Sequence, residues 1–262
     1  MSRPLLLASN DDGYDAPGLR GMVEALRSWA DVVVVAPKHE QSGQSHSISL
    51  HHPLRHEVMG DDVHAIDGTP ADCVYCALYR EDLLPRRPDL VVSGMNHGPN
   101  LGSDVYYSGT VAAAREGALR GVPALAFSMV GGAGPVAPCA RLASDLAKRT
   151  LEAVPPEGQP VLLNVNFPRP SVGDRPFAGV RATRLGRRHY SEGVDVRRDP
   201  RGREYFWIGL PGAPKHVPLD GSDTDAIEAG MVSVTPLTLE ATRGDHFGLA
   251  SFVAGPRPHA AE

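Results

Sequence analysis

The sequence has few cysteines, no long hydrophobic run and no excess of positive charge, and each shortage excludes a class of protein. Three cysteines in 262 residues do not make a disulfide framework. No stretch approaches the roughly twenty apolar residues of a membrane span, and the first residues lack the charged-then-apolar layout of a secretory signal. We therefore expect a cytoplasmic protein with no membrane partner.

The charge balance gives no general electrostatic reason to bind nucleic acid or membrane, and it leaves local basic stretches as the alternative. With 26 basic and 31 acidic residues the formal net charge is -5, so we expect no specific binding to duplex nucleic acid. Free nucleotides are different, because a metal ion can meet their phosphates locally. Cys73 and Cys76 have C-x-x-C spacing, but no second Cys or His pair completes a zinc site. Packing inside a helix is the favoured interpretation, with a redox role as the alternative.

Short apolar runs bounded by turn residues are what the sequence does contain. They occur at residues 5–9, 32–35, 90–92 and 123–128, with amphipathic or alanine-rich segments between them. This alternation predicts an α/β fold with a mostly parallel sheet that is covered on both faces. A hydrophobic fraction of 42% over this length is enough for a substantial core.

A change of composition divides the chain near residue 168. Residues 161–168 are predicted to be the last strand of the main sheet, which gives a catalytic core over residues 1–168. Arg, Gly and Pro become frequent in residues 169–262, the C-terminal arm and oligomerisation segment, which we expect to return to the core. Residues 169–215 are predicted to form an arm or hairpin off the core, with an exposed strand at 204–208. Such arms commonly mediate subunit contacts.

Two adjacent acids, Asp11 and Asp12, follow the first predicted strand. Ligands bind at the carboxyl ends of the strands in parallel sheets, so these acids lie where chemistry is usually done. They would repel one another unless something positive lies beside them, and a hard divalent cation is the simplest answer. The alternative is an ordinary solvated turn.

Loops after the other strands supply further oxygen atoms. Ser42 follows the second strand and Asn96 the third, and hydroxyl, amide and carboxylate oxygens suit Mg²⁺, Mn²⁺ or Ca²⁺ and not a structural zinc. Ser108, Gly109 and Thr110 begin the alanine-rich helix, where free N–H groups favour an anion, although the hydroxyls could simply be helix caps. Together these are the parts of a phosphate-ester hydrolase. Further candidates for substrate binding in the same loops are Asn10, Gly43 and Asn100.

These motifs resemble the SurE family, the stationary-phase survival group of 5'/3'-nucleotidases. The resemblance is carried by residues 9–13 (Ser-Asn-Asp-Asp-Gly), by 93–100 and by 104–111. It extends through residues 68–73, 164–168 (Asn-Val-Asn-Phe-Pro) and 233–237. It therefore covers nearly all of the chain except the last twenty or so residues.

The resemblance implies a fold, a reaction and a ligand set. The fold would be a Rossmann-like three-layer core with a C-terminal β-hairpin arm and tail exchanged between the subunits of a homodimer or homotetramer. The activity would be metal-dependent hydrolysis of nucleoside 5'-monophosphates, and of 3'-monophosphates as an open alternative. One Mg²⁺ or Mn²⁺ ion per subunit would be bound by Asp11, Asp12, Ser42 and Asn96. Phosphate would be bound by Ser108, Gly109 and Thr110.

Departures from the family pattern are small, and the reaction route stays open. Ser9, Met95 and Ala112 differ from the residues frequent in the family, but none removes a donor oxygen, so we expect an active enzyme. Asp11 and Asp12 are the catalytic candidates, and Asp11 is the better nucleophile if water does not attack directly. The sequence does not decide between Mg²⁺ and Mn²⁺, between 5' and 3' esters, or among the bases.

Three other protein classes compete with this interpretation. A haloacid-dehalogenase-type phosphatase needs Asp-x-Asp, whereas the acids here are adjacent. A response-regulator receiver needs its phosphoacceptor Asp after the third strand, where this chain has Ser93 and Gly94. A non-catalytic nucleotide sensor could use the same cleft, and only turnover distinguishes it from an enzyme.

Overall fold

Runs of buried aliphatic residues form the strands of a central sheet. The computed structural model describes residues 3–131, 135–153, 161–171, 173, 176–191, 193–209, 214–242 and 244–255. In this part of the chain the main sheet has nine strands in the order β3-β4-β2-β1-β5-β6-β7-β13-β8. Its inner strands pair in parallel and are β1 (Leu5–Ser9), β2 (Asp31–Pro37), β5 (Leu90–His97), β6 (Ala124–Met129) and β7 (Leu162–Phe167). The parallel α/β fold predicted from the sequence is confirmed.

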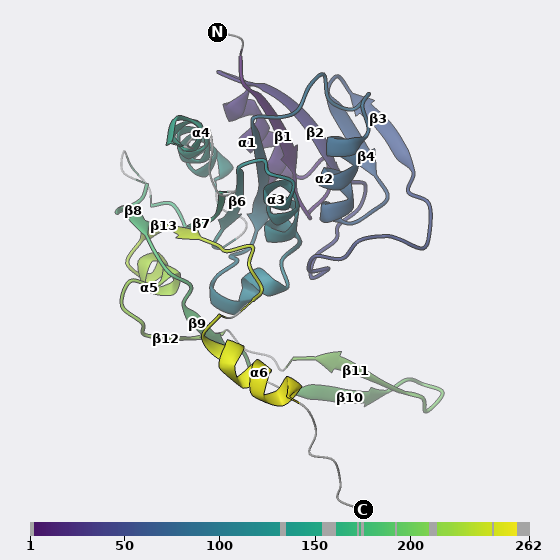
Figure 1. Ribbon diagram of the computed structural model, residues 1–262, viewed down its shortest axis with the longest axis vertical. Coiled ribbons are helices and arrows are strands. Elements are labelled where there is room, and N and C mark those ends of the chain that lie inside the picture. Colours follow the sequence, from purple (N-terminus) through teal and green to yellow (C-terminus); the bar gives the residue numbers. More distant parts are fainter. Residues whose placement is uncertain are drawn as a thin grey trace, which may run out of the picture.

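Helices cover both faces of this sheet and make three layers (Figure 1). Side chains alternate along each strand, so Leu6 packs into one hydrophobic core and Leu7 into the other. The first core contains α1 (Pro17–Leu26) and α4 (Val136–Ala153). The second contains α2 (Pro70–Tyr79) and α3 (Gly109–Leu119).

The strand order brings the predicted site loops to one edge. The chain passes from β1 to β2 on one side and later returns to β5 on the other side of β1. Ligands of open parallel sheets bind at such a switch point, outside the carboxyl ends of the strands. Asp11 follows β1 there, Ser42 follows β2, and Asn96 lies near the end of β5.

Very small residues let α3 approach the sheet closely. A Cβ atom at Gly117 would lie 2.6 Å from Cγ2 of Val91, and the alanines at 112, 113 and 114 are fully buried. The alanine-rich sequence of α3 thus corresponds to close packing on the sheet. This packing sets the distance between the start of α3 and the ends of β1 and β5.

One prediction about the sheet is wrong. Residues 161–168 were expected to be its last strand, but β13 (Met231–Pro236) pairs antiparallel with β7, and β8 (Gly179–Ala182) pairs parallel with β13. β8 therefore belongs to the main sheet although it lies within the segment assigned to the arm. The physical reason is that β7 would otherwise be an open edge, and a distant segment of the chain covers it.

The rest of the C-terminal segment is more exposed. β9 (Arg187–His189) pairs with β12 (Lys215–Val217), and β10 (Val194–Arg198) pairs with β11 (Glu204–Ile208) in a hairpin that projects from the core (Figure 1). All five residues of β11 are exposed, as predicted. The remaining elements are β3 (His56–Gly60), β4 (Val63–Ile66), α5 (Asp223–Glu228), α6 (Phe247–Ala254) and the 3-10 helices η1 (Gly102–Tyr106) and η2 (Gly244–His246).

The cysteines are free thiols. Cys73 and Cys76 lie on α2 and Cys139 on α4. Burial raises the pKa of both C-x-x-C thiols, which disfavours the reactive thiolate. None of the helices among the described residues has the length and apolar character that a bilayer crossing requires.

We predict that Gly117→Ala lowers the free energy of unfolding by about 1–3 kcal/mol, because the added methyl group overpacks the contact with Val91. Urea unfolding followed by circular dichroism measures the change. The matched control is Gly60→Ala, whose Cβ would be 4.0 Å from its nearest neighbour. It should stay within about 0.5 kcal/mol of wild type. Equal stability of the two variants would show that α3 does not need this close approach.

Candidate metal and phosphate site

The turn after β1 is closed by Asn10. Its Nδ2 donates to the backbone oxygen of Gly13 at 2.8 Å, and Gly13 has a φ of +106°, which favours glycine. The Asn10 side chain is buried, and its Oδ1 has no hydrogen-bond partner among the described residues. Asn10, a candidate for substrate binding, thus shapes the turn that carries the two acids.

Asp11 lies against the start of α3 and is only 4% exposed. The Thr110 hydroxyl donates to its Oδ1, and a Cβ atom at Gly109 would lie 2.8 Å from the Asp11 Cβ. Only glycine at 109 allows this approach. The carboxylate therefore lies at the positive end of the α3 dipole.

Burial raises the pKa of the Asp11 carboxyl from 3.8 to about 6. The hydrogen bond from Thr110 lowers this pKa, and the charge of Asp12 raises it again. The helix start thus offsets only part of the cost of placing a carboxylate here. A positive charge beside the acids would offset the rest.

Asp12 connects the β1 turn to the end of β5. Its Oδ2 accepts the backbone N–H of His97 at 3.2 Å, and it is half-buried. Burial raises its pKa, and the charge of Glu40 raises it further. Asp12 therefore lies beside the strand end that carries Asn96.

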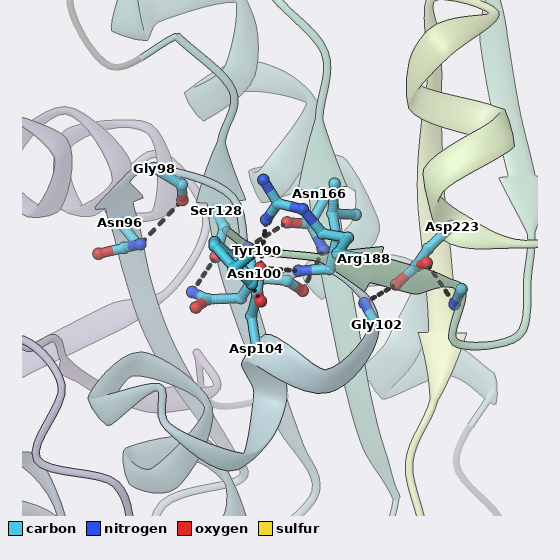
Figure 2. A network of polar contacts seen from close by, with 12 residues as sticks. Asn96, Gly98, Asn100, Gly102, Asp104, Ser128, Asn166, Arg188, Tyr190 and Asp223 are labelled. Atoms are coloured by element: carbon cyan, nitrogen blue, oxygen red, sulfur yellow. Dashed lines mark hydrogen bonds and ion pairs between the residues drawn. The ribbon is translucent and has the colours of Figure 1, made fainter. Parts of the chain in front are cut away.

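Asn96 offers one oxygen to this region. Its Nδ2 donates to the backbone oxygen of Gly98 at 2.8 Å, and the carboxamide oxygen points away from Gly98 (Figure 2). That hydrogen bond fixes which end of the amide is the oxygen. Asn96 can thus act as a hard oxygen ligand.

The loop after β2 is held beside the acids by its backbone. The N–H of Gln41 donates to the Asp11 backbone oxygen at 2.7 Å. The adjacent Ser42 hydroxyl donates to Glu40 at 2.8 Å, so in this structure it faces Glu40. Gly43 is exposed, with open space around it and a φ of +73°. The backbone of this loop thus lies beside Asp11, while the Ser42 side chain binds Glu40 of the same loop.

The hydroxyls at the helix start already have partners in the chain. Ser108 Oγ accepts the Val111 N–H at 3.0 Å as an N-cap, and the Thr110 hydroxyl binds Asp11. The capping alternative is therefore realised for Ser108. What the helix start still offers an anion is its dipole and backbone N–H groups.

The donor set fits a hard divalent cation with few protein ligands. No cluster of three or more His, Cys, Asp or Glu side chains in the described part of the chain could hold a metal ion, so these residues do not build a zinc cage. Asp11 and Asp12 supply carboxylate oxygens and Asn96 an amide oxygen. The groups that shift the pKa of Asp11 include no cation among the described residues.

Comparison with known proteins assigns the chain to a family. The family model described as "Survival protein SurE" matches residues 6–192. The chain belongs to the SurE family. A protein named 5'-nucleotidase SurE from Sorangium cellulosum strain So ce56 is 54% identical over 264 residues, which cover 98% of this chain and 100% of that protein. Another of that name from Vibrio cholerae serotype O1 is 44% identical over 240 residues and covers 90% and 92%.

The same family appears among solved structures. The crystal structure of the SurE protein from Aquifex aeolicus aligns with a TM-score of 0.82 at 39% identity, over 96% of this chain and all of that one. The Rossmann-like core expected of a SurE protein is therefore confirmed. The exchange of arms between subunits and the ligand set stay predictions.

Sequence reasoning about this SurE protein missed three contributors to the site. They are Gln41, which fixes the position of Asp11, and Glu40 and His97, which act on Asp12. The signal available for Glu40 was the polar loop after β2. The backbone N–H groups of Gln41 and His97 have no sequence signal, since any residue other than proline could supply them.

We predict that Asp11→Asn stabilises the metal-free SurE protein above about pH 6. The folded-state pKa of Asp11 lies above 3.8, so its contribution to stability is present below pH 3.8 and is lost as the pH rises through about 6. With chelator at pH 7.5 the variant should gain up to about 3 kcal/mol. Urea unfolding at several pH values measures this.

The matched control is Asp15→Asn, which removes one negative charge from an exposed position in the same loop. It should leave the pH dependence of wild type unchanged. If Asp11→Asn follows the same pH curve as wild type, the burial of Asp11 has no electrostatic cost and this description of the site is wrong.

Proposed function

We propose that this chain is a metal-dependent phosphomonoesterase that hydrolyses nucleoside 5'-monophosphates to nucleoside and phosphate. The observation that carries the proposal is the placement of the Asp11 carboxylate against the N-terminus of α3, with Asp12 adjacent in the chain. An acid pair next to an anion-binding helix start is suited to a cation and a phosphate together. The name 5'-nucleotidase given to close relatives supports the substrate class.

Each residue has a defined part in this reaction. Asp11, Asp12, Asn96 and Ser42 would hold the cation, and for Ser42 this requires its hydroxyl to give up the hydrogen bond to Glu40. A bound Mg²⁺ or Mn²⁺ supplies stabilisation of the charge on the phosphoryl oxygens. The N–H groups of Gly109 and its neighbours at the start of α3 orient the phosphate. Thr110 holds Asp11 in place through its hydroxyl.

Two tyrosines are candidates for contact with the nucleoside. Tyr106 and Tyr107 are 65% and 69% exposed and directly precede Ser108. Ser45, in the loop of Ser42, donates to the backbone oxygens of both. The two tyrosines are exposed and adjacent in the chain to Ser108, and an exposed aromatic ring can stack on a base of any identity.

We also propose a homodimer or homotetramer built through the hairpin of β10 and β11. Large apolar side chains are exposed on this hairpin and on α6, which is unusual for a free surface. They are Val194, Val196, Phe206, Trp207 and Ile208 on the hairpin, and Phe247, Leu249, Phe252 and Val253 on α6. A projecting hairpin of this kind is suited to exchange between subunits.

We predict release of inorganic phosphate from AMP or GMP in the presence of Mn²⁺ or Mg²⁺, and loss of this release with chelator. Colorimetric phosphate assays on a panel of 5'- and 3'-monophosphates measure it. Asp12→Asn should reduce kcat/KM by at least about a hundredfold, because it removes a carboxylate charge that would help to hold the cation beside the reacting phosphate.

Asp15→Asn serves again as the charge-matched control and should retain wild-type activity. Nucleotide binding without phosphate release from any monophosphate would favour the sensor alternative over the enzyme. Full activity of Asp12→Asn would rule out the proposed role of that residue.

The oligomer has its own test. Gly209 N–H donates to the Gly193 oxygen at 2.9 Å, so residues 194–208 can be replaced by a two-residue Asn-Gly turn without moving the ends. We predict a smaller species by size exclusion with light scattering. Arg201→Ser at the exposed hairpin turn is the control and should elute as wild type. An unchanged mass after the replacement would mean that other surfaces hold the subunits together.

A further inference from the structure

Two asparagines in the middle of the sheet have no part in the reaction described so far. Asn164 and Asn166 lie on β7 and are fully buried. They are two positions apart and therefore point to the same face of the strand. A buried amide is costly unless its donor and acceptor atoms are used, so such a pair needs a reason.

Asn166 binds the backbone of Asn100 as a neighbouring strand would. Its Oδ1 accepts the Asn100 N–H at 2.8 Å, and its Nδ2 donates to the Asn100 oxygen at 3.1 Å (Figure 2). This pair of bonds reproduces the two bonds exchanged between residues of antiparallel strands. Asn164 Nδ2 donates to the same Asn100 oxygen at 2.8 Å and so fills its second lone pair.

The second half of the loop that receives these bonds is buried, and none of the strands in the described part of the chain pairs with it. Asn100 is 7% exposed, and Leu101 and Gly102 are buried. A buried peptide group must find a hydrogen-bond partner. Only an asparagine side chain of this length offers both a donor and an acceptor in the plane of the peptide. The side chains of Asn164 and Asn166 thus supply the hydrogen bonds that the backbone of Asn100 does not receive from a strand.

The position of this loop sets two parts of the proposed site. At its beginning, the Gly98 oxygen holds the amide of Asn96, and at its end η1 leads directly into Ser108 and α3. Asn96 and Asn166 also lie in one row across the sheet, both in register with Ser128 of β6. Ser128 Oγ in turn accepts from Asn100 Nδ2 at 2.8 Å.

Residues of the C-terminal segment bind the end of the loop and the 3-10 helix η1 that follows it. The Gly102 N–H donates to Asp223 Oδ2 at 2.9 Å. Arg188 and Tyr190 both bind Asp104, the latter at 2.7 Å through its hydroxyl (Figure 2). These contacts anchor η1, and Asn100 remains the only one of the five residues 98–102 that the β7 asparagines bind among the described contacts.

We propose that Asn166, assisted by Asn164, is a positioning residue that holds the loop of residues 98–102 in the conformation that binds the substrate phosphate. The inference rests on the proposed function for its kinetic consequence. Without Asn166, the loop populates other conformations, and the apparent affinity falls by the fraction that stays competent. Once substrate is bound the site is complete. The effect therefore falls on KM and spares kcat.

The variants differ in how many of these bonds they remove. Asn166→Ala removes both bonds to Asn100 and should raise KM for AMP about tenfold, with kcat within about twofold of wild type. Asn166→Asp keeps the acceptor and loses the donor, and should also raise KM. Asn164→Ala leaves the Asn100 oxygen with one donor and should raise KM by less than about threefold.

The matched control is Ser233→Ala. Ser233 is fully buried, lies in register with Asn166 on β13, and its Oγ has no partner among the described residues. Loss of that hydroxyl perturbs the same row of the sheet without touching Asn100. It should leave KM and kcat unchanged.

The experiment measures steady-state kinetics and amide hydrogen exchange on all four variants, at a temperature well below their thermal transitions. We expect faster exchange confined to peptides covering residues 98–110 in Asn166→Ala. KM should rise most in Asn166→Ala and least in Asn164→Ala. This exchange readout needs neither metal nor turnover. If wild type hydrolyses no monophosphate, the proposed function fails while the exchange result still decides the role of Asn166.

Wild-type exchange and wild-type KM in a folded Asn166→Ala protein would overturn the inference. So would a fall in kcat alone, or faster exchange spread evenly over the sheet. Should Asn166→Ala not fold, Asn166→Asp and Asn164→Ala decide in its place. Unchanged KM and loop exchange in both of them would overturn it equally.

Discussion

The burial of the Asp11 carboxylate against the first turn of α3 is the constraint on which the rest of the site depends. It requires glycine at 109, because a Cβ there would touch Asp11, and it requires α3 to lie close to the sheet. The helix dipole and Thr110 offset part of the desolvation cost, yet the pKa of Asp11 still rises to about 6. The positive charge of a bound cation would offset the rest of that cost.

Polar side chains lie in a row across the sheet beside this site. Asn96, Ser128, Asn166 and Ser233 lie side by side across four strands. Parallel strands covered on both faces usually carry apolar residues there. Asn96, Ser128 and Asn166 instead bind the loop of residues 98–102, and so connect β7 with the start of α3. Catalysis and packing thus share the same residues at the carboxyl edge.

The sequence allowed prediction of those features that local patterns determine. Apolar runs gave the inner strands. A local signal of the same kind lies at α2, where Thr69 before Pro70 forms a full capping box with Asp72. The acid pair and the helix start at Ser108 were identifiable because chemistry at strand ends follows from parallel topology. The placement of β13 beside β7, and of β8 beside β13, was not, because nothing in residues 161–168 tells which distant segment covers that edge. The bonds from Asn166 to Asn100 span 66 positions and are equally invisible in the sequence.

The central claim is that burial raises the pKa of Asp11 to about 6 in the metal-free protein, so that a divalent cation would displace a proton at low pH. Calorimetry of Mn²⁺ binding to the metal-free protein, in buffers of different ionisation enthalpy, counts the protons released. We expect release of about one proton near pH 5 that declines toward zero near pH 8. Binding with no proton release at about pH 5 would contradict the claim, because the carboxylate would then already be ionised in the empty site.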